Sequence, residues 1–401
     1  MCMKNEEWKE YEMSELIDEI SMGPFGSNIK VECFVDSGIP VLNGSNLVGF
    51  RLNEDSFNYV TEEKATSLGK ANAYRGDIVI THRGTLGQIV YIPQNSKYER
   101  YVISQSQFRV RCSPKVLPEY LVYYFHSRLG QHKLLSNASQ VGVPSLARPT
   151  STFQKLTIEI PSIERQKEIV KILSALDDKI ELNNAINRNL EEQIQTLFLE
   201  MFSNEPSEPL GTVVETTSGG TPNRKNEEFY ENGSVCWVKS KELQGSFITD
   251  TEEKITMEAL VKSAAKIIPA NSVMIAMYGA TVGEYGIISK EMACNQAVCA
   301  LLENEKYPYT YLFMLVKTRK QDLINMAVGS AQQNISQVII KEMLVHSDLD
   351  KIQKFHKCVA PLFQEMKQNK EESVLLKDLL NYLLPKLMSN EINVDLARSS
   401  R

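Results

Sequence analysis

The sequence has little that would place the protein in a membrane or outside the cell. Its seven cysteines are odd in number and scattered, with no C-x-x-C pair, which argues against a disulfide framework or a structural zinc site. No apolar run is long enough to cross a bilayer, and the charged start MCMKNEEWKEYEM lacks the apolar core of a signal peptide. We expect reduced thiols, no metal site, no transmembrane helix and a cytoplasmic protein.

An excess of positive charge is also missing. The 44 Lys and Arg residues are outnumbered by 50 Asp and Glu residues, which gives a formal net charge of −6. A protein that binds DNA by itself over a wide surface is usually basic. Composition therefore gives no support to nucleic-acid binding. A DNA-facing side must gather its Lys and Arg locally, or a partner must supply part of the positive field.

Signatures of catalysis are absent as well. No G-x-x-x-x-G-K-[ST] occurs, so GPFGSN from Gly23 is not a phosphate-binding loop, and neither G-x-S-x-G nor H-E-x-x-H is present. The N-P-P-Y and D-P-P-Y runs of amino-methyltransferases are missing, and the five histidines have no ligand-like spacing. We expect no catalytic residue on this chain, which favours a recognition or scaffold role.

The chain does contain an internal repeat. NAYRGDIVITHRGTLGQIVYI from Asn72 and KIIPANSVMIAMYGATVGEYGII from Lys266 each place a glycine-bracketed turn between two alternating apolar runs, as expected for paired strands. GIPVLNGSNLVG from Gly38 aligns with GSVCWVKSKELQG from Gly233, and three more segments align in the same order, at a period of about 190 residues. Because a chance match is improbable for five ordered segments, we interpret the chain as a duplicated mixed α/β domain, each copy followed by a helix.

Both predicted helices carry a heptad seam with a polar middle. Apolar residues alternate at spacings of four and three, which indicates a coiled coil, but Asn183 and Asn187 interrupt the first seam and Asn369 and Ser373 the second. A seam Asn lowers stability but fixes register, because a slipped pairing would bury it without a partner. We predict Asn183, Asn187 and Asn369 as register residues.

Two arrangements of these helices remain open. Matching polar middles favour pairing within the chain, and antiparallel pairing is the easier geometry because a globular domain lies between the helices in the sequence. This arrangement is a rigid rod with one domain near each end and a pseudo-two-fold axis. The other arrangement is a coil that joins several copies of the chain.

The first helix region resembles a known family. IPSIERQKEIVKILSALDDKIELNNAINRNLEEQIQTLF closely resembles the central conserved region of the specificity subunit of type I restriction–modification systems. That region has a Pro, an Arg-Gln pair, an LD-x-KI run and an N-x-x-I-N-x-x-L-E run, which here are Pro161, Arg165 with Gln166, residues 176–180 and residues 183–191.

The two globular halves resemble target recognition domains of the same family. The first does so through GIPVLNGSNL, GDIVITHRGTLG and ISQSQF, and the second through TSGGTPNRKNEEFY, CWVKSKEL, EKITMEAL, SVMIAMYGATVG and CNQAV. The resemblance covers essentially the whole chain. It departs before the second helix, where HSDLDKIQ keeps Gln353 but lacks the expected Pro.

The resemblance implies an α+β fold with two mixed α/β target recognition domains joined by two long antiparallel coiled-coil helices. It also implies a non-catalytic subunit that binds double-stranded DNA, with each domain reading half of a split target and the coil setting the gap. Two methyltransferase subunits would dock on the coil and carry S-adenosylmethionine, with no cofactor on this chain. Restriction subunits complete a DNA-cleaving complex, although in a related variant one partner carries both methylation and cleavage.

The predicted boundaries are residues 1–160 and 204–346 for the recognition domains, 161–203 and 347–392 for the helices, and 393–401 for a tail. Sequence readout needs Arg or Lys for guanine and Asn or Gln for adenine, together with phosphate contacts. The candidate DNA-binding residues in polar loops are Ser45, Asn46, His82, Arg83, Thr85, Gln105, Gln107, Asn223, Arg224, Lys225, Lys239, Ser240, Lys241, Tyr278, Asn295, Gln296, Gln332, Gln333 and Asn334. For each of them a solvated loop or a turn cap remains the alternative, and the rival for the whole chain is a coiled-coil scaffold with duplicated protein-binding domains.

Overall fold

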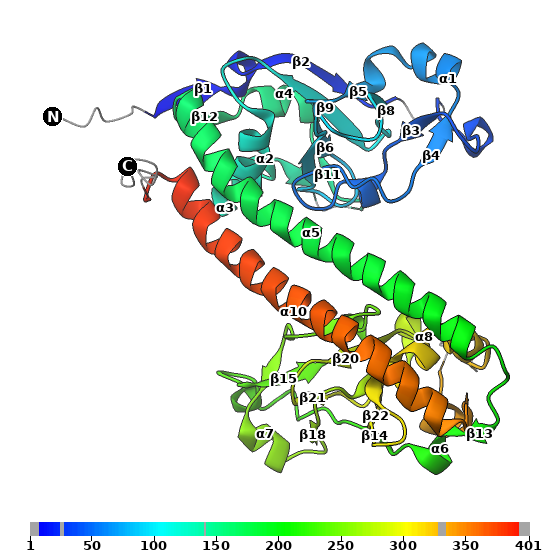
Figure 1. The fold of residues 1–401 in the computed structure, drawn as a ribbon. Helices are drawn as coiled ribbons and strands as arrows, with labels where there is room; N and C mark the ends of the chain where they lie inside the picture. The colour runs from blue at the N-terminus through cyan, green and yellow to red at the C-terminus, as the bar shows by residue number, and fades with distance from the viewer. Residues whose placement is uncertain (1–7, 25–27, 140–141, 328–333, 393–401) are drawn as a thin grey trace, which may run out of the picture. The chain divides into compact units, whose positions relative to one another are not determined.

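A computed structural model describes residues 8–24, 28–139, 142–327 and 334–392, and it divides the chain into two compact units (Figure 1). Unit 1 comprises Met1–Asp177 and Asp378–Arg401, and unit 2 comprises Asp178–Lys377. The boundaries between the units therefore fall inside the two long helices, α5 (Ile163–Met201) and α10 (Leu349–Met388). The domain boundaries predicted from the sequence remain a prediction.

Unit 1 is built on two four-stranded sheets. The first has the order β2-β9-β6-β7 and the second β4-β3-β8-β5. Their strands are β2 (Ile17–Met22), β3 (Ile39–Val41), β4 (Asn58–Val60), β5 (Asn72–Tyr74), β6 (Ile78–Thr81), β7 (Ile89–Tyr91), β8 (Arg100–Val102) and β9 (Gln107–Cys112). Two short pairs, β1 (Lys9–Glu12) with β12 (Thr157–Ile160) and β10 (Ala138–Ser139) with β11 (Ser145–Leu146), complete the strands. The helices are α1 (Glu62–Ser67), α2 (Pro118–His126), α3 (Arg128–Leu134), α4 (Pro149–Gln154) and the 3-10 turns η1 (Met13–Glu15), η2 (Val31–Cys33), η3 (Gly44–Asn46) and η4 (Gly69–Ala71).

Unit 2 has a five-stranded sheet, β14-β22-β19-β20-β16, and a four-stranded sheet, β17-β15-β21-β18. Its strands are β13 (Glu208–Pro209), β14 (Thr216–Ser218), β15 (Val235–Val238), β16 (Phe247–Ile248), β17 (Lys254–Ile255), β18 (Ile267–Ile268), β19 (Val273–Ala276), β20 (Tyr285–Ile288), β21 (Met292–Cys294), β22 (Val298–Leu301) and β23 (Leu344–Val345). Its helices are α6 (Leu210–Val213), α7 (Met257–Val261), α8 (Tyr309–Asn325), α9 (Gln337–Glu342) and the 3-10 turns η5 (Glu227–Phe229), η6 (Ser240–Glu242) and η7 (Gly279–Thr281).

The sheet topologies confirm the internal repeat. β2-β9-β6-β7 corresponds to β14-β22-β19-β20, with antiparallel pairing throughout both sets. In the second sheets, β3 pairs parallel with β8 and antiparallel with β4, as β15 does with β21 and β17. Even the extra strand β16 has a counterpart, because Arg51 forms a single parallel bridge to Tyr91 of β7. Alternating apolar residues and turn glycines therefore specify the same α+β architecture twice.

The long helices contribute to the core of each unit. In unit 1, Ile169 and Leu173 of α5 belong to the same buried cluster as Leu384 and Leu387 of α10. In unit 2, the second half of α5 and the first half of α10 likewise share one cluster, which includes Leu190, Ile194, Phe355 and Val359. The predicted apolar seams are thus buried against one another within the chain.

A polar layer lies between the helices in unit 2. Asn183 is fully buried, and its Nδ2 donates to Glu372 Oε2 at 2.8 Å, to Ser373 Oγ at 3.3 Å and to Asn369 O at 3.3 Å. Asn187 Nδ2 donates to Met366 O at 3.0 Å, and Asn369 Nδ2 donates to Asn187 Oδ1 at 2.9 Å. The later residue of α5 meets the earlier residue of α10, so the pairing is antiparallel. The role of these residues in fixing register remains a prediction.

Equivalent glutamines anchor the start of each long helix. Gln166 Nε2 donates to Pro161 O at 3.0 Å and its Oε1 accepts from Leu117 N at 2.9 Å. Gln353 Nε2 donates to Glu305 O at 2.7 Å in the matching loop of unit 2. The loop anchor therefore survives the missing Pro in HSDLDKIQ. Within the described ranges, no helix is both long and apolar enough to span a membrane.

Candidate nucleic-acid interface

Hydrogen bonds join four segments of unit 1 near one end of its first sheet. His82 N donates to Ser106 O at 2.8 Å, which ties the β6–β7 turn to the β8–β9 loop. Gly84 N donates to Pro144 O at 2.9 Å, which adds the segment before β11. Gln88 Nε2 donates to the carbonyl of residue 44 at 3.0 Å and links η3 to the same turn. We call residues 43–46, 82–88, 103–107 and 144–146 the unit 1 loop cluster.

Four predicted residues are exposed in this cluster, and they are Ser45, Arg83, Thr85 and Gln105. His82 is half-buried, and its Nε2 donates to Gln105 O at 3.0 Å. Burial lowers the pKa of His82, so its imidazole is neutral near pH 7 and offers hydrogen bonding in place of charge. The exposed set supplies one cation, two hydroxyls and one amide, which are groups suited to bases and phosphates.

Asn46 and Gln107 lie inside unit 1 and do not face solvent. Asn46 is 1% exposed, and its Nδ2 donates to Asn53 O and Ser56 O at 3.0 and 2.9 Å. Gln107 is 0% exposed, and its Oε1 accepts from Ser104 N at 2.9 Å. Both amides shape the loops that carry the exposed residues. Their burial removes them from the set that we propose to contact bases.

Unit 2 has the matching loop cluster. Met277 N donates to Ala297 O and Ile335 N donates to Met277 O, both at 2.8 Å, and Tyr278 bridges to Asn334 as Arg83 bridges to Ser145 in unit 1. We call residues 277–281, 295–297 and 334–335 the unit 2 loop cluster.

Among the candidates in this cluster, Tyr278, Gln296 and Asn334 are exposed. Asn295 is half-buried and its Oδ1 accepts from Ala297 N at 3.1 Å, so it caps the turn. Gln332 and Gln333 lie outside the described residues. The exposed candidates of this cluster are therefore neutral.

The cations of unit 2 lie on the neighbouring segments. Asn223 and Lys225 are both exposed, and Asn223 Oδ1 accepts from Lys225 N at 3.1 Å. Ser240 is half-buried at the start of η6. The Arg224 guanidinium stacks over Tyr230, 4.5 Å from the ring centroid. Its cation–π contact fixes the side chain at a site where sequence alone indicated only a polar loop.

Sequence reasoning missed the acidic partners of these cations. Glu253 Oε2 lies 2.7 Å from Arg224 Nη2 and 3.3 Å from Lys239 Nζ, and Glu252 pairs with Lys241 and, at 3.5 Å, with Lys239. The adjacent EEK run was the available signal, but nothing in its spacing connects it to residue 224.

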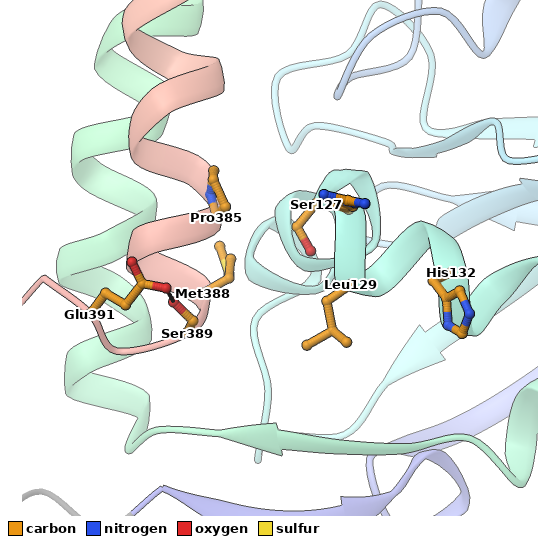
Figure 2. A pocket seen from close by; sticks show the side chains of 8 residues that line it. Ser127, Leu129, His132, Pro385, Met388, Ser389 and Glu391 are labelled. Atoms are coloured by element: carbon orange, nitrogen blue, oxygen red, sulfur yellow. Dashed lines mark hydrogen bonds between the residues drawn. The ribbon is translucent and has the colours of Figure 1, made fainter.

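A separate cavity of about 390 Å³ lies in unit 1 between α3 and the end of α10 (Figure 2). It is lined by Ser127, Arg128, Leu129, His132, Pro385, Met388, Ser389 and Glu391. None of the candidate DNA-binding residues lines it. In the part of the chain that the structure describes, no group of three or more His, Cys, Asp or Glu side chains is arranged to hold a metal ion.

The fold and its sites define a duplicated α+β protein with a polar loop cluster on each unit. A family model described as the type I restriction modification DNA specificity domain matches residues 5–192 and 206–354, and the chain belongs to this family. The predicted resemblance to specificity subunits is confirmed.

Curated relatives are specificity subunits of type I restriction enzymes. The chain is 28% identical to the EcoR124I/EcoR124II specificity subunit of Escherichia coli over 228 residues, 53% of this chain and 54% of that protein, so the match spans about half of that relative. It is 25% identical to the MjaIX specificity subunit of Methanocaldococcus jannaschii over 84% of this chain and 82% of the relative. It is also 22% identical to the HindI specificity subunit of Haemophilus influenzae over 96% of this chain and the whole relative.

A solved structure shares the fold. The crystal structure of the type I restriction-modification system S subunit from M. genitalium superposes with a TM-score of 0.59 at 18% identity, covering 96% of this chain and 97% of the other.

Proposed function

We propose that this chain is the non-catalytic DNA-recognition subunit of a type I restriction–modification complex, and that each unit reads one half of a bipartite target in double-stranded DNA. One observation carries the proposal: the two units repeat the same sheets and present hydrogen-bonded loop clusters at equivalent positions. Duplicated readers suit a target with two half-sites, because each module contacts its own bases.

Paired helices suit the role of a spacer in this proposal. The antiparallel contacts of α5 and α10, with their polar layer in unit 2, favour one register over slipped alternatives. A fixed spacer raises the effective concentration of the second reading module once the first has bound. We propose that the same helices dock two methyltransferase subunits in the cytoplasm, with restriction subunits as further partners.

The chemistry belongs to the partners in this proposal. S-adenosylmethionine is expected on the methyltransferase, which would extrude the target adenine from the duplex. An acidic recognition subunit is compatible with DNA binding if the partners provide part of the phosphate contact that dominates affinity. The net charge of −6 is thus consistent with a subunit that works only within an assembly.

The test is genome-wide adenine methylation in a strain that carries this chain and a methyltransferase partner, compared with a strain lacking only this chain. We expect a split motif, two short half-sites with an unspecified gap, to lose methylation on deletion and to regain it on complementation. Unchanged methylation, with both proteins expressed in the parent strain, contradicts DNA recognition and favours the scaffold alternative.

A further inference from the structure

Five charged side chains of unit 2 form a closed set of ion pairs. Arg224 pairs with Glu253 at 2.7 Å, Lys239 with Glu253 at 3.3 Å and with Glu252 at 3.5 Å, and Lys241 pairs with Glu252. We call these five residues the unit 2 ion cluster. Its three cations are all candidate DNA-binding residues, and each of them has a carboxylate partner.

The side chain of Glu242 joins the two backbone segments that carry the lysines and the glutamates. Glu242 is the third residue of η6, and its Oε2 accepts from Lys239 N at 2.7 Å while its Oε1 accepts from Glu252 N at 2.8 Å. The half-buried carboxylate of Glu242 therefore holds the start of η6 next to the segment that precedes β17. The ion pairs of Glu252 and Glu253 with the lysines are therefore supported by a fixed backbone arrangement.

Four of the five cluster positions can be aligned with described residues of unit 1. Asn46 closes η3 by accepting from Asn43 N, as Glu242 closes η6, so Asn43 and Ser45 correspond to Lys239 and Lys241. β4 pairs with β3 as β17 pairs with β15, with Val60 opposite Ile39 and Ile255 opposite Val235.

Counting back along the strands from Val60 and Ile255 aligns Phe57 and Asn58 with Glu252 and Glu253. All four equivalent residues of unit 1 are uncharged. The shared fold therefore does not require charges at these four positions, although unit 2 carries a charge at each of them.

We propose that Glu252 and Glu253 are an internal counter-charge that suppresses sequence-independent DNA binding by unit 2 and thereby sharpens its specificity. The inference rests on the proposed function of unit 2 as a DNA reader. Backbone phosphates must displace the two carboxylates before they reach the three cations. On a target duplex, base contacts compensate the free-energy cost of displacing the carboxylates. A random duplex makes only phosphate contacts and has no such compensation.

The protonation states are consistent with this role. The hydrogen bond from Lys241 lowers the pKa of Glu252, and the hydrogen bond from Arg224 lowers the pKa of Glu253. Both carboxylates are therefore ionised at neutral pH and oppose phosphate there. Fewer cations are free to release counterions from DNA, which lowers the salt dependence of binding.

The first experiment measures binding of a random-sequence duplex by the full-length chain across a salt series. The variant is E252Q/E253Q, and the matched control is E258Q/E291Q, which removes two exposed charges of unit 2 outside the cluster. Because each phosphate contact changes the affinity by about half a decade between about 200 and about 50 mM salt, we expect E252Q/E253Q to bind more tightly than its control. The ratio of the two affinities should grow about tenfold over that range, with a salt slope steeper by about 2. Equal affinity of the variant and its control overturns the inference.

A double-mutant cycle tests the coupling with single exposed residues. Lys241 and Glu252 are 57% and 61% exposed, so neither substitution endangers folding. K241Q should leave random-duplex affinity nearly unchanged in the parent chain and weaken it about threefold in the E252Q background, where the lysine is free. The same loss in both backgrounds contradicts the inference.

A third arm separates this inference from the proposed function. The chain assembled with its methyltransferase partner is tested on the duplex identified from the methylome and on a scrambled duplex. If the parent assembly shows no preference, the proposed function fails. The specificity ratio is the affinity for the target duplex divided by the affinity for the scrambled duplex. We expect this ratio to be about tenfold lower for E252Q/E253Q than for E258Q/E291Q. If the parent assembly prefers its target but the two variants have equal ratios, only the counter-charge inference fails.

Discussion

Units 1 and 2 share one topology but stabilise it with different interiors. Asp77 precedes β6 as Ser272 precedes β19, and each closes a tight turn through a hydrogen bond, from Tyr74 N to Asp77 Oδ2 and from Ser272 Oγ to Pro269 O. One strand over, Arg109 lies opposite Val79 where Ala300 lies opposite Met274. The same sheet is thus charged inside in one unit and apolar in the other.

The interior of unit 1 contains a complete ion network. Asp77 pairs with Arg111 at 2.9 Å and with Arg109 at 3.3 Å, and Arg109 pairs with Glu19 at 2.7 Å. The side chains of Asp77 and Arg109 are only 1% and 3% exposed. In unit 2, Met274 and Ala300 belong to an apolar cluster. The comparison teaches that strand register and apolar alternation define this topology, while interior polarity can vary as long as every buried charge has a partner.

The largest expected difference between the units comes from breaking that network. Asp77→Ala removes one of the two carboxylates that pair with buried Arg109 and also breaks the pair with Arg111, so it should destabilise unit 1 by about 3–5 kcal/mol. Ser272→Ala removes one neutral hydrogen bond and should cost unit 2 about 1 kcal/mol. Hydrogen exchange of β6 and β9 against β19 and β22 measures each unit separately. Equal losses of protection in the two units would show that the ion pairs of Asp77 add no stability to that of its turn hydrogen bond.

The next difference concerns the paired helices. Leu173 is fully buried in unit 1, so Leu173→Ala should destabilise that unit by about 2–5 kcal/mol through lost burial and a cavity. Asn183→Leu should instead stabilise unit 2 by about 1 kcal/mol while weakening the preference for one register. Hydrogen exchange along α5 reports both changes. Destabilisation by Asn183→Leu would mean that its hydrogen bonds outweigh the apolar gain.

A functional difference is expected at the equivalent exposed glutamines. Gln105→Ala should relax methylation specificity in one half-site and Gln296→Ala in the other, each by about 1–3 kcal/mol of discrimination. Gln321→Ala, at an exposed position of α8, is the matched control. Methylome sequencing of the three strains gives the result. Relaxation of both half-sites by either single variant would contradict the assignment of one unit to one half-site.

The smallest effect is shared by the units and concerns pH. Burial lowers the pKa of His126 in unit 1 and of His346 in unit 2 below the ordinary 6.5. The unfolded chain therefore takes up protons first, so both units should lose stability as pH falls below about 6.5. Unfolding of the parent and of His346→Asn, followed between about pH 7.5 and 5.5, tests this. The substitution should reduce the pH dependence of unit 2, where burial also lowers the pKa of His356, and should leave unit 1 unaffected. An unchanged slope in unit 2 contradicts it.

The sequence predicted the repeated strands and the helical seams correctly because their signals are local. Period-two alternation, turn glycines and heptad spacing depend on neighbours within a few residues. The candidate site was less predictable. Ser45 and Asn46 are adjacent polar residues of one turn, yet Ser45 is exposed and Asn46 is held inside by carbonyls of Asn53 and Ser56. A polar loop residue can face either way, and the partner that decides this lies outside the turn.

The sequence by itself determined that this protein is a duplicated α+β chain with two long helices of matched polar middles, because hydrophobic periodicity is written along the chain. Only the tertiary structure decided which polar groups meet. It brought Asp77 to Arg109 and it brought Glu253 to Arg224. Electrostatic partners are set by through-space distance, and strands that are neighbours in a sheet need not be neighbours in the sequence.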